Sequence, residues 1–193
     1  MNLLFLLLFS YLIGSLPFSL IFAKLFKGVD VRQVGTGNVG ASNTLISAGK
    51  AAGILAALFD LTKGFAVIIM ARNFSGSDQI IALCGFLAIV GHDFPIYLKF
   101  KGGKGVATTM GALIAINPYA VWAGLGFYII SLLVTRYLIL STLLTVSILP
   151  LLLFYLKEDV WYIIFAVAVA LLMIFVHRED VRRLIAGRET RFP

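Results

Sequence analysis

Apolar residues in this chain form long unbroken runs instead of the alternating or amphipathic patterns of soluble proteins. Most runs are apolar on every helical face over 17 to 21 residues, which lets a helix cross about 30 Å of hydrocarbon. Seven spans are expected: Leu3–Ala23, Ala51–Ala71, Gln79–Leu98, Gly105–Ile116, Tyr119–Thr135, Leu138–Leu156 and Val160–Val176. The pattern therefore predicts an all-α, polytopic integral membrane protein with about seven transmembrane helices.

Composition supports the same class. Of the 193 residues, 61% are hydrophobic and 13% are charged, and the mean hydropathy of +1.01 lies far above that of soluble domains. The first run lacks the basic start and the cleavage site of a signal peptide, so we expect a retained helix. Short connections and the lack of internal repeats predict one membrane-embedded domain over residues 1–193.

The positive charges predict an orientation. Most Lys and Arg residues fall in alternate loops, within residues 24–50, 99–104 and 178–191 and at Arg136, whereas the opposite loops hold only Arg72 and Lys157. Because cytoplasmic loops carry the excess of Lys and Arg, we expect the N-terminus outside and the C-terminus in the cytoplasm. The net charge of +7 then belongs to a cytoplasmic face, and no nucleic-acid partner is expected.

The fourth run is short, and the loop before it is rich in glycine and lysine. Its 12 residues make about 18 Å of helix, too short to cross a bilayer alone. In the stretch KFKGGKGVATTMG, Gly102, Gly103 and Gly105 offer backbone amides beside Lys104 at a helix start, an arrangement that suits a phosphate or a carboxylate. The alternative is a flexible basic turn that only follows the positive-inside rule. A nucleotide P-loop is excluded because Gly105 stands where Ser or Thr is required.

A second glycine cluster, RQVGTGNVGASNT, is expected on the same side of the membrane. Gly37 and Gly40 permit tight backbone, while Thr36, Asn38 and Asn43 provide short donors and acceptors. The segment is either the lining of a polar pocket or an ordinary surface loop.

A few polar residues lie inside or at the ends of the runs. Asp60 and Lys63 are three residues apart on one helical face, and we expect mainly a structural pair. His92 and His177 stand near cytoplasmic helix ends, where a histidine either moves a proton or caps a helix. The sequence predicts no metal site and no nucleophilic catalysis.

Taken together, three cytoplasmic stretches resemble the motifs of the PlsY-type acyl-phosphate:glycerol-3-phosphate acyltransferases. They are GTGNVGASNT, GHDFPIYLKFKGGKGVATTMG and HREDVRRLIAGRE, and FDLTKG and RYLILST also fit. The resemblance covers nearly the whole chain. It implies a membrane enzyme that transfers a fatty acyl group from acyl phosphate to the sn-1 hydroxyl of glycerol 3-phosphate, giving lysophosphatidic acid and phosphate.

The resemblance also implies site residues, substrates and location. Catalysis is assigned to Lys104, Thr142 and His177, and substrate binding to Thr36, Gly37, Asn38, Gly40, Asn43, Gly102, Gly103, Gly105 and Asp180. We expect acyl phosphate, glycerol 3-phosphate and membrane lipid as partners, no cofactor, and a monomer. The expected location is the bacterial inner membrane, with the active site facing the cytoplasm.

Departures from the family pattern leave alternatives open. Thr36 and Thr142 stand where the family usually has Ser, and Asp180 stands where Asn is usual. Ile46 occupies the usual position of an Arg, so one phosphate-binding cation is lost. A catalytically inactive paralogue and a small anion or organophosphate transporter are the alternative functions.

Overall fold

The computed structural model describes residues 2–192, and every regular element in that range is helical. The helices are α1 (Leu3–Gly14), α2 (Phe18–Lys27), α3 (Ala41–Ala48), α4 (Lys50–Phe74), α5 (Asp78–Asp93), the 3-10 turn η1 (Ile96–Leu98), α6 (Val106–Ile116), α7 (Pro118–Thr135), α8 (Leu138–Tyr155), α9 (Val160–Val176) and α10 (Arg178–Ile185). The chain forms two compact units, unit 1 ending at Ala115 and unit 2 beginning at Ile116.

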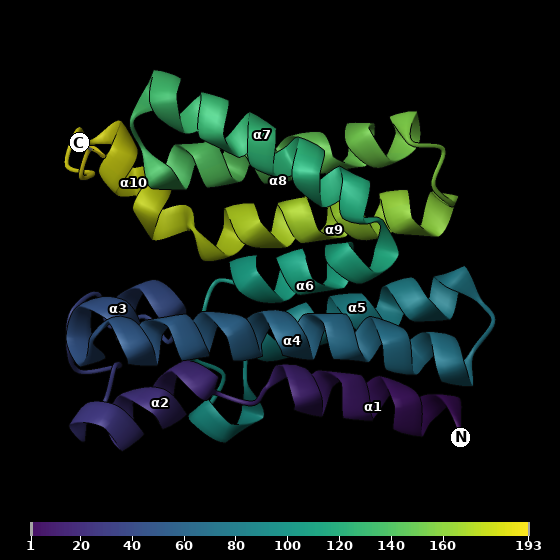
Figure 1. Ribbon diagram of the computed structural model, residues 1–193, viewed down its shortest axis with the longest axis horizontal. Helices are drawn as coiled ribbons and strands as arrows, with labels where there is room; N and C mark the ends of the chain where they lie inside the picture. The colour runs from purple at the N-terminus through teal and green to yellow at the C-terminus, as the bar shows by residue number, and fades with distance from the viewer. Residues whose placement is uncertain (1, 193) are drawn as a thin grey trace. The chain divides into compact units, whose positions relative to one another are not determined.

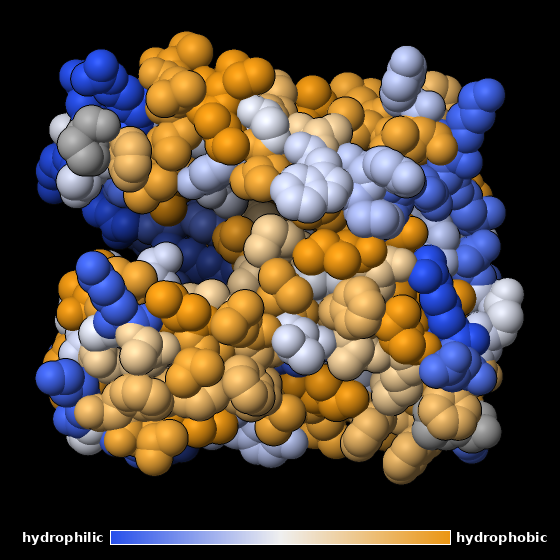
Figure 2. Space-filling model, in the orientation of Figure 1, coloured by the Kyte–Doolittle hydropathy of each residue, from blue (hydrophilic) through white to orange (hydrophobic). Residues whose placement is uncertain are grey.

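The all-α membrane class is confirmed. Within the described residues, five helical segments are long and apolar enough to cross a membrane, and the bent pair α9 and α10 makes a sixth candidate. Helix α6 is apolar but has only 11 residues. The count of seven spans, the orientation of the termini and the single domain stay predictions. Figure 2 shows mostly hydrophobic residues along the sides of the helices and hydrophilic residues near their ends.

The predicted run Leu3–Ala23 is not one helix. Helix α1 ends at Gly14, and α2 begins at Phe18 after the non-helical Pro17, as the break between them in Figure 1 shows. Proline has no backbone N–H and its ring obstructs the preceding turn, so the helix is interrupted there. The carbonyl of Leu16, which the break leaves without a helical partner, accepts a hydrogen bond of 3.0 Å from Lys63 Nζ.

The third run is also shorter as a helix than predicted. Helix α5 ends at Asp93, two residues before Pro95, and the chain continues into η1. A residue before proline is disfavoured in helical conformation, which explains the stop. Helix α3, in the second glycine cluster, was not predicted.

Glycine allows the helices of unit 1 to approach closely. Cβ atoms at Gly14 and Gly91 would collide with the backbones of α5 and α1, and Cβ atoms at Gly64 and Gly111 with those of α6 and α4. Helix α1 packs along α5, and α2 and α3 pack on α4, as Figure 1 shows. In unit 2, α8 lies between α7 and α9. Unit 1 is thus a tightly packed frame that holds both glycine-rich stretches.

Candidate active site

The glycine cluster that comes earlier along the chain, RQVGTGNVGASNT, is organised by one buried side chain. Asn43 is 1% exposed, and its amide nitrogen donates to the carbonyls of Val31 (2.7 Å), Val34 (3.1 Å) and Asn38 (3.0 Å). Its oxygen accepts from the backbone N–H of Thr36 at 2.9 Å. We call residues 35–43 the first loop. Asn43 therefore holds this loop in shape, and its direct contact with a substrate stays a prediction.

The other predicted residues of the first loop lie on its outer part. Thr36 and Asn38 are exposed or partly exposed, and the Thr36 hydroxyl accepts a weak hydrogen bond of 3.4 Å from the N–H of Asn38. Gly37 has a φ of +73°, a conformation that L side chains rarely adopt. Gly40 precedes α3, and its carbonyl accepts the N–H of Thr44 at 3.0 Å. Polar groups of this loop are thus presented beside the start of a helix.

The segment that enters the first loop carries a local ion pair. Asp30 and Arg32 are 2.6 Å apart, and the hydrogen bonds from Arg32 lower the pKa of Asp30 to about 2. The same contact raises the pKa of Arg32 above its ordinary value. Arg32 is therefore already paired with Asp30 where the chain enters the first loop.

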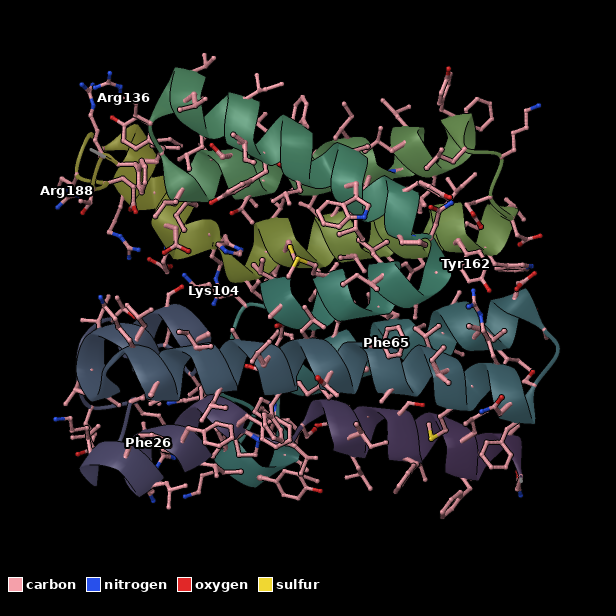
Figure 3. The ribbon with its side chains drawn as sticks, viewed as in Figure 1. Phe26, Phe65, Lys104, Arg136, Tyr162 and Arg188 are labelled. Carbon is pink, nitrogen blue, oxygen red and sulfur yellow. The ribbon has the colours of Figure 1, made fainter. Side chains whose placement is uncertain are left out.

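The glycine–lysine loop, residues 99–105, is tied to the end of α5. The N–H of Gly102 donates to the carbonyl of Asp93 and that of Gly103 to the carbonyl of His92, both at 3.0 Å. A role of these two amides as phosphate donors would require them to be free, but the structure has them engaged. Gly105 has a φ of +70° and leads into α6, whose first-turn amides have no acceptor within the helix. Figure 3 shows Lys104 at the start of α6.

The two loops meet at Gly103. A Cβ atom on Gly103 would lie 2.8 Å from the carbonyl oxygen of Val39 in the first loop and would collide with Nε2 of His92. The predicted residues of unit 1 are therefore brought to one place: Thr36, Gly37, Asn38, Gly40, Asn43, Gly102, Gly103, Lys104 and Gly105.

Beneath these loops lies a cluster of buried ionisable side chains. The predicted pair is confirmed, with Lys63 Nζ 2.7 Å from Asp60 Oδ1. Sequence reasoning missed that Asp60 Oδ1 is also 3.4 Å from Nδ1 of His92. It also missed that neither carboxylate oxygen of Asp93 has a hydrogen-bond partner among the described residues. The sequence did contain one signal for how the glycine–lysine loop is anchored. Pro95, two residues after Asp93, ends α5, so the carbonyls of His92 and Asp93 are left to accept hydrogen bonds from the loop.

Three predicted residues belong to unit 2. His177 is 2% exposed and follows α9, with Nδ1 2.9 Å from the carbonyl oxygen of Met173. Asp180, also 2% exposed, pairs with Arg183. Thr142 lies near the start of α8 and donates to the carbonyl of Leu138 at 2.9 Å.

The C-terminal segment closes the same end of unit 2. The N–H of Phe192 donates to the carbonyl of Arg136 at 2.7 Å, and Arg191 donates to the Tyr137 hydroxyl at 3.0 Å. Figure 3 shows Arg136 and Arg188 at that end. Thr142, near the start of α8, and His177, at the end of α9, therefore belong to the same end of unit 2 as Arg136. Among the described residues, no group of three or more His, Cys, Asp or Glu side chains could hold a metal ion.

Comparisons with known proteins agree along nearly the whole chain. Residues 4–187 match the family described as Glycerol-3-phosphate acyltransferase. A glycerol-3-phosphate acyltransferase of Aquifex aeolicus is 38% identical, with 100% of both chains covered. One from Geotalea daltonii is 37% identical over 95% of this chain and 94% of its own.

Two crystal structures of PlsY (YgiH), an integral membrane glycerol 3-phosphate acyltransferase, share the fold. The glycerol 3-phosphate form is 38% identical with a TM-score of 0.92, covering 99% of this chain and 96% of that one. The lysophosphatidic acid form is 37% identical with a TM-score of 0.91, covering 99% and 95%.

Proposed function

The chain belongs to the glycerol-3-phosphate acyltransferase family, and we propose that it transfers a fatty acyl group from acyl phosphate to the sn-1 hydroxyl of glycerol 3-phosphate. The products are lysophosphatidic acid and inorganic phosphate. The family match confirms the resemblance seen in the three motifs. The protein is an integral membrane acyltransferase of phospholipid synthesis. The observation that carries the proposal is the identity of 38% with a structure in its glycerol 3-phosphate form, over 99% of this chain.

The glycine–lysine loop supplies the recognition of phosphate. Lys104 adds a cation beside the start of α6, and the first-turn amides of α6 point the positive end of the helix dipole the same way. The packing at Gly103 leaves no space for a side chain, so the backbone that leads into Lys104 and α6 is held in place. Thr36 and Asn38 of the first loop offer additional donors.

The chemistry requires little covalent help. Acyl phosphate is a mixed anhydride whose phosphate is a good leaving group, so positioning of the two substrates and stabilisation of negative charge account for most of the rate. The acceptor hydroxyl attacks the acyl carbon, the bond to the phosphate oxygen breaks, and a phosphate oxygen takes the proton. His177 orients the acceptor hydroxyl in this scheme, Thr142 is the other catalytic residue of unit 2, and Asp180 binds substrate.

The departures from the family pattern at Ile46 and Asp180 bear on how active the enzyme is expected to be. Ile46 is 67% exposed and provides no cation. Asp180 pairs with Arg183, which also bonds to Glu189, so one shared guanidinium offsets only part of its negative charge. The match to the family over nearly the whole chain favours an active enzyme over an inactive paralogue.

A reconstituted assay tests the function. Purified protein with acyl phosphate and glycerol 3-phosphate should release inorganic phosphate and form lysophosphatidic acid in equal amounts. Acyl-CoA should not replace acyl phosphate, because the chain has no recognisable adenine-nucleotide site. Uptake of phosphate compounds into sealed vesicles without acylated product would favour the transporter, and inert protein that still binds glycerol 3-phosphate would indicate the paralogue.

The membrane orientation is part of the proposal. The protein lies in the bacterial inner membrane as a monomer, with the glycine–lysine loop in the cytoplasm. Single cysteines at Lys101 and Thr190 should react with an impermeant thiol reagent only from the cytoplasmic side, and one at Ser77 only from outside. The native Cys84 is buried, so its background is low. Labelling of Thr190 and Ser77 from the same side would contradict an odd number of spans.

A further inference from the structure

Four ionisable side chains lie in the interior of unit 1 and have no part in the proposed chemistry. Asp60, Lys63, His92 and Asp93 are all 8% exposed or less. A buried ion pair adds little net stability compared with apolar residues of the same volume, because desolvation offsets the attraction. Stability is therefore a poor explanation for this cluster, and its contacts suggest another.

His92 holds Gly103 in two ways. Its carbonyl accepts the N–H of Gly103 at 3.0 Å, and its Nε2 fills the space that a side chain on Gly103 would need. The opposite wall of that space is the Val39 carbonyl. Gly103 is thus enclosed between the imidazole ring and the first loop, directly before Lys104.

The orientation of the His92 ring is fixed by the contact of its other nitrogen, Nδ1. Its Nδ1 lies 3.4 Å from Asp60 Oδ1, and the same oxygen is 2.7 Å from Lys63 Nζ. Lys63 in turn donates to the Leu16 carbonyl at the break between α1 and α2. With Nδ1 directed to the carboxylate, Nε2 is the ring atom that faces Gly103. The contacts form one chain from the helix break to the glycine–lysine loop.

We propose that His92, oriented by Asp60 and Lys63, is a positioning residue that fixes Gly103 and thereby places Lys104 against the phosphate of glycerol 3-phosphate. The proposal rests on the proposed function and refines its acceptor site. His92 acts through the loop, and the substrate touches Lys104.

The test begins with His92→Asn. Asparagine keeps an N–H donor near the position of Nδ1 for Asp60 but removes the ring from Gly103. We expect the KM for glycerol 3-phosphate to rise about tenfold, because Gly103 loses the ring that packs against it; a tenfold change corresponds to about 1.4 kcal/mol. The KM for acyl phosphate should stay unchanged and kcat should change less. Ser10→Ala is the matched control, because the Ser10 hydroxyl is also buried in unit 1 and donates to the Leu6 carbonyl within α1.

A double variant separates positioning from general destabilisation. Gly103→Ala alone should impair acceptor use severely, since its methyl meets Nε2 of His92. In the His92→Asn background that side is open, so the added loss from Gly103→Ala should be several-fold smaller. Multiplicative losses, or parallel changes in both KM values, in kcat and in the melting temperature, would overturn the proposal.

Binding of glycerol 3-phosphate, measured by titration calorimetry, distinguishes the two proposals. Wild-type protein that forms no product yet binds glycerol 3-phosphate about tenfold more tightly than His92→Asn would refute the acyltransferase reaction and uphold the positioning role. Equal affinities would refute the positioning role whatever the assay shows.

Discussion

The two loops of unit 1 that meet at Gly103 are held in different ways. The first loop is organised within its own segment, because Asn43 bonds to carbonyls 5 to 12 residues away. The glycine–lysine loop has no such internal organiser; its backbone bonds to the end of α5, and its packing depends on His92 and on Asp60 of α4. The first loop is therefore held by contacts within its own segment, whereas the glycine–lysine loop depends on buried side chains in the interior of unit 1.

Breaking the interior support should have the largest effect on stability. Asp60→Asn leaves the buried ammonium of Lys63 without its counter-charge, which we expect to cost about 3–5 kcal/mol of unfolding free energy. Thermal unfolding in detergent measures the loss. Adding Lys63→Met removes the unpaired charge, so the double variant should recover most of the stability. A single variant as stable as wild type would mean that the pair is not a buried ion pair.

Breaking the local support should have a smaller effect. Asn43→Ala leaves three carbonyls and the Thr36 N–H without their partner, at an expected cost of about 2–3 kcal/mol because solvent reaches part of the loop. Asn43→Asp keeps the acceptor for Thr36 but sets a buried carboxylate against three carbonyl oxygens, so near neutral pH it should be at least as destabilising as alanine. Limited proteolysis should cut within residues 31–40 before it cuts elsewhere. Early cleavage in the glycine–lysine loop instead would contradict the independence of the first loop.

The contrast between the loops explains what the sequence could predict. Helices α4, α6, α7, α8 and α9 were predicted because each depends on a continuous apolar run. The pairing of Asp60 with Lys63 followed from their spacing along one helix. The contact of His92 with Asp60 joins two helices, and no local pattern encodes it.

The site was predicted in part for the same reason. Glycine and lysine at residues 102–105 indicate where an anion can bind, because that preference is local. The engagement of the Gly102 and Gly103 amides depends on where α5 stops and how the chain folds back, which is a tertiary effect. The break at Pro17 was missed because the surrounding apolar run is uninterrupted and outweighs one proline in a hydropathy pattern.

In the glycine–lysine loop, Lys104 is expected to contribute to substrate use but little to stability. Lys104→Ala removes a charge-assisted contact with phosphate, so kcat/KM for glycerol 3-phosphate should fall by roughly 10- to 150-fold. The melting temperature should change little, and Lys101→Ala is the matched control on the same loop. Unchanged kinetics in a folded variant would show that the loop only follows the positive-inside rule.

The smallest effect belongs to the entrance of the first loop. Arg32 lowers the pKa of Asp30 to about 2, below the ordinary value of 3.8, so the folded state binds the proton less well than the unfolded state. The stabilisation is therefore present above about pH 4 and is lost as the pH falls through about 2. Because the Arg32 side chain is 41% exposed, solvent screening keeps the contribution below about 1 kcal/mol.

Comparing wild type with Asp30→Asn checks this. The small difference in unfolding free energy at about pH 6 should shrink as the pH falls toward about 2, where Asp30 is already half protonated, and should vanish only at still lower pH. A difference that persists at the acid end would mean that Asp30 acts through its shape or its backbone contacts. Turnover near neutral pH should be unaffected, because this pair supports only the approach to a loop that Asn43 already holds.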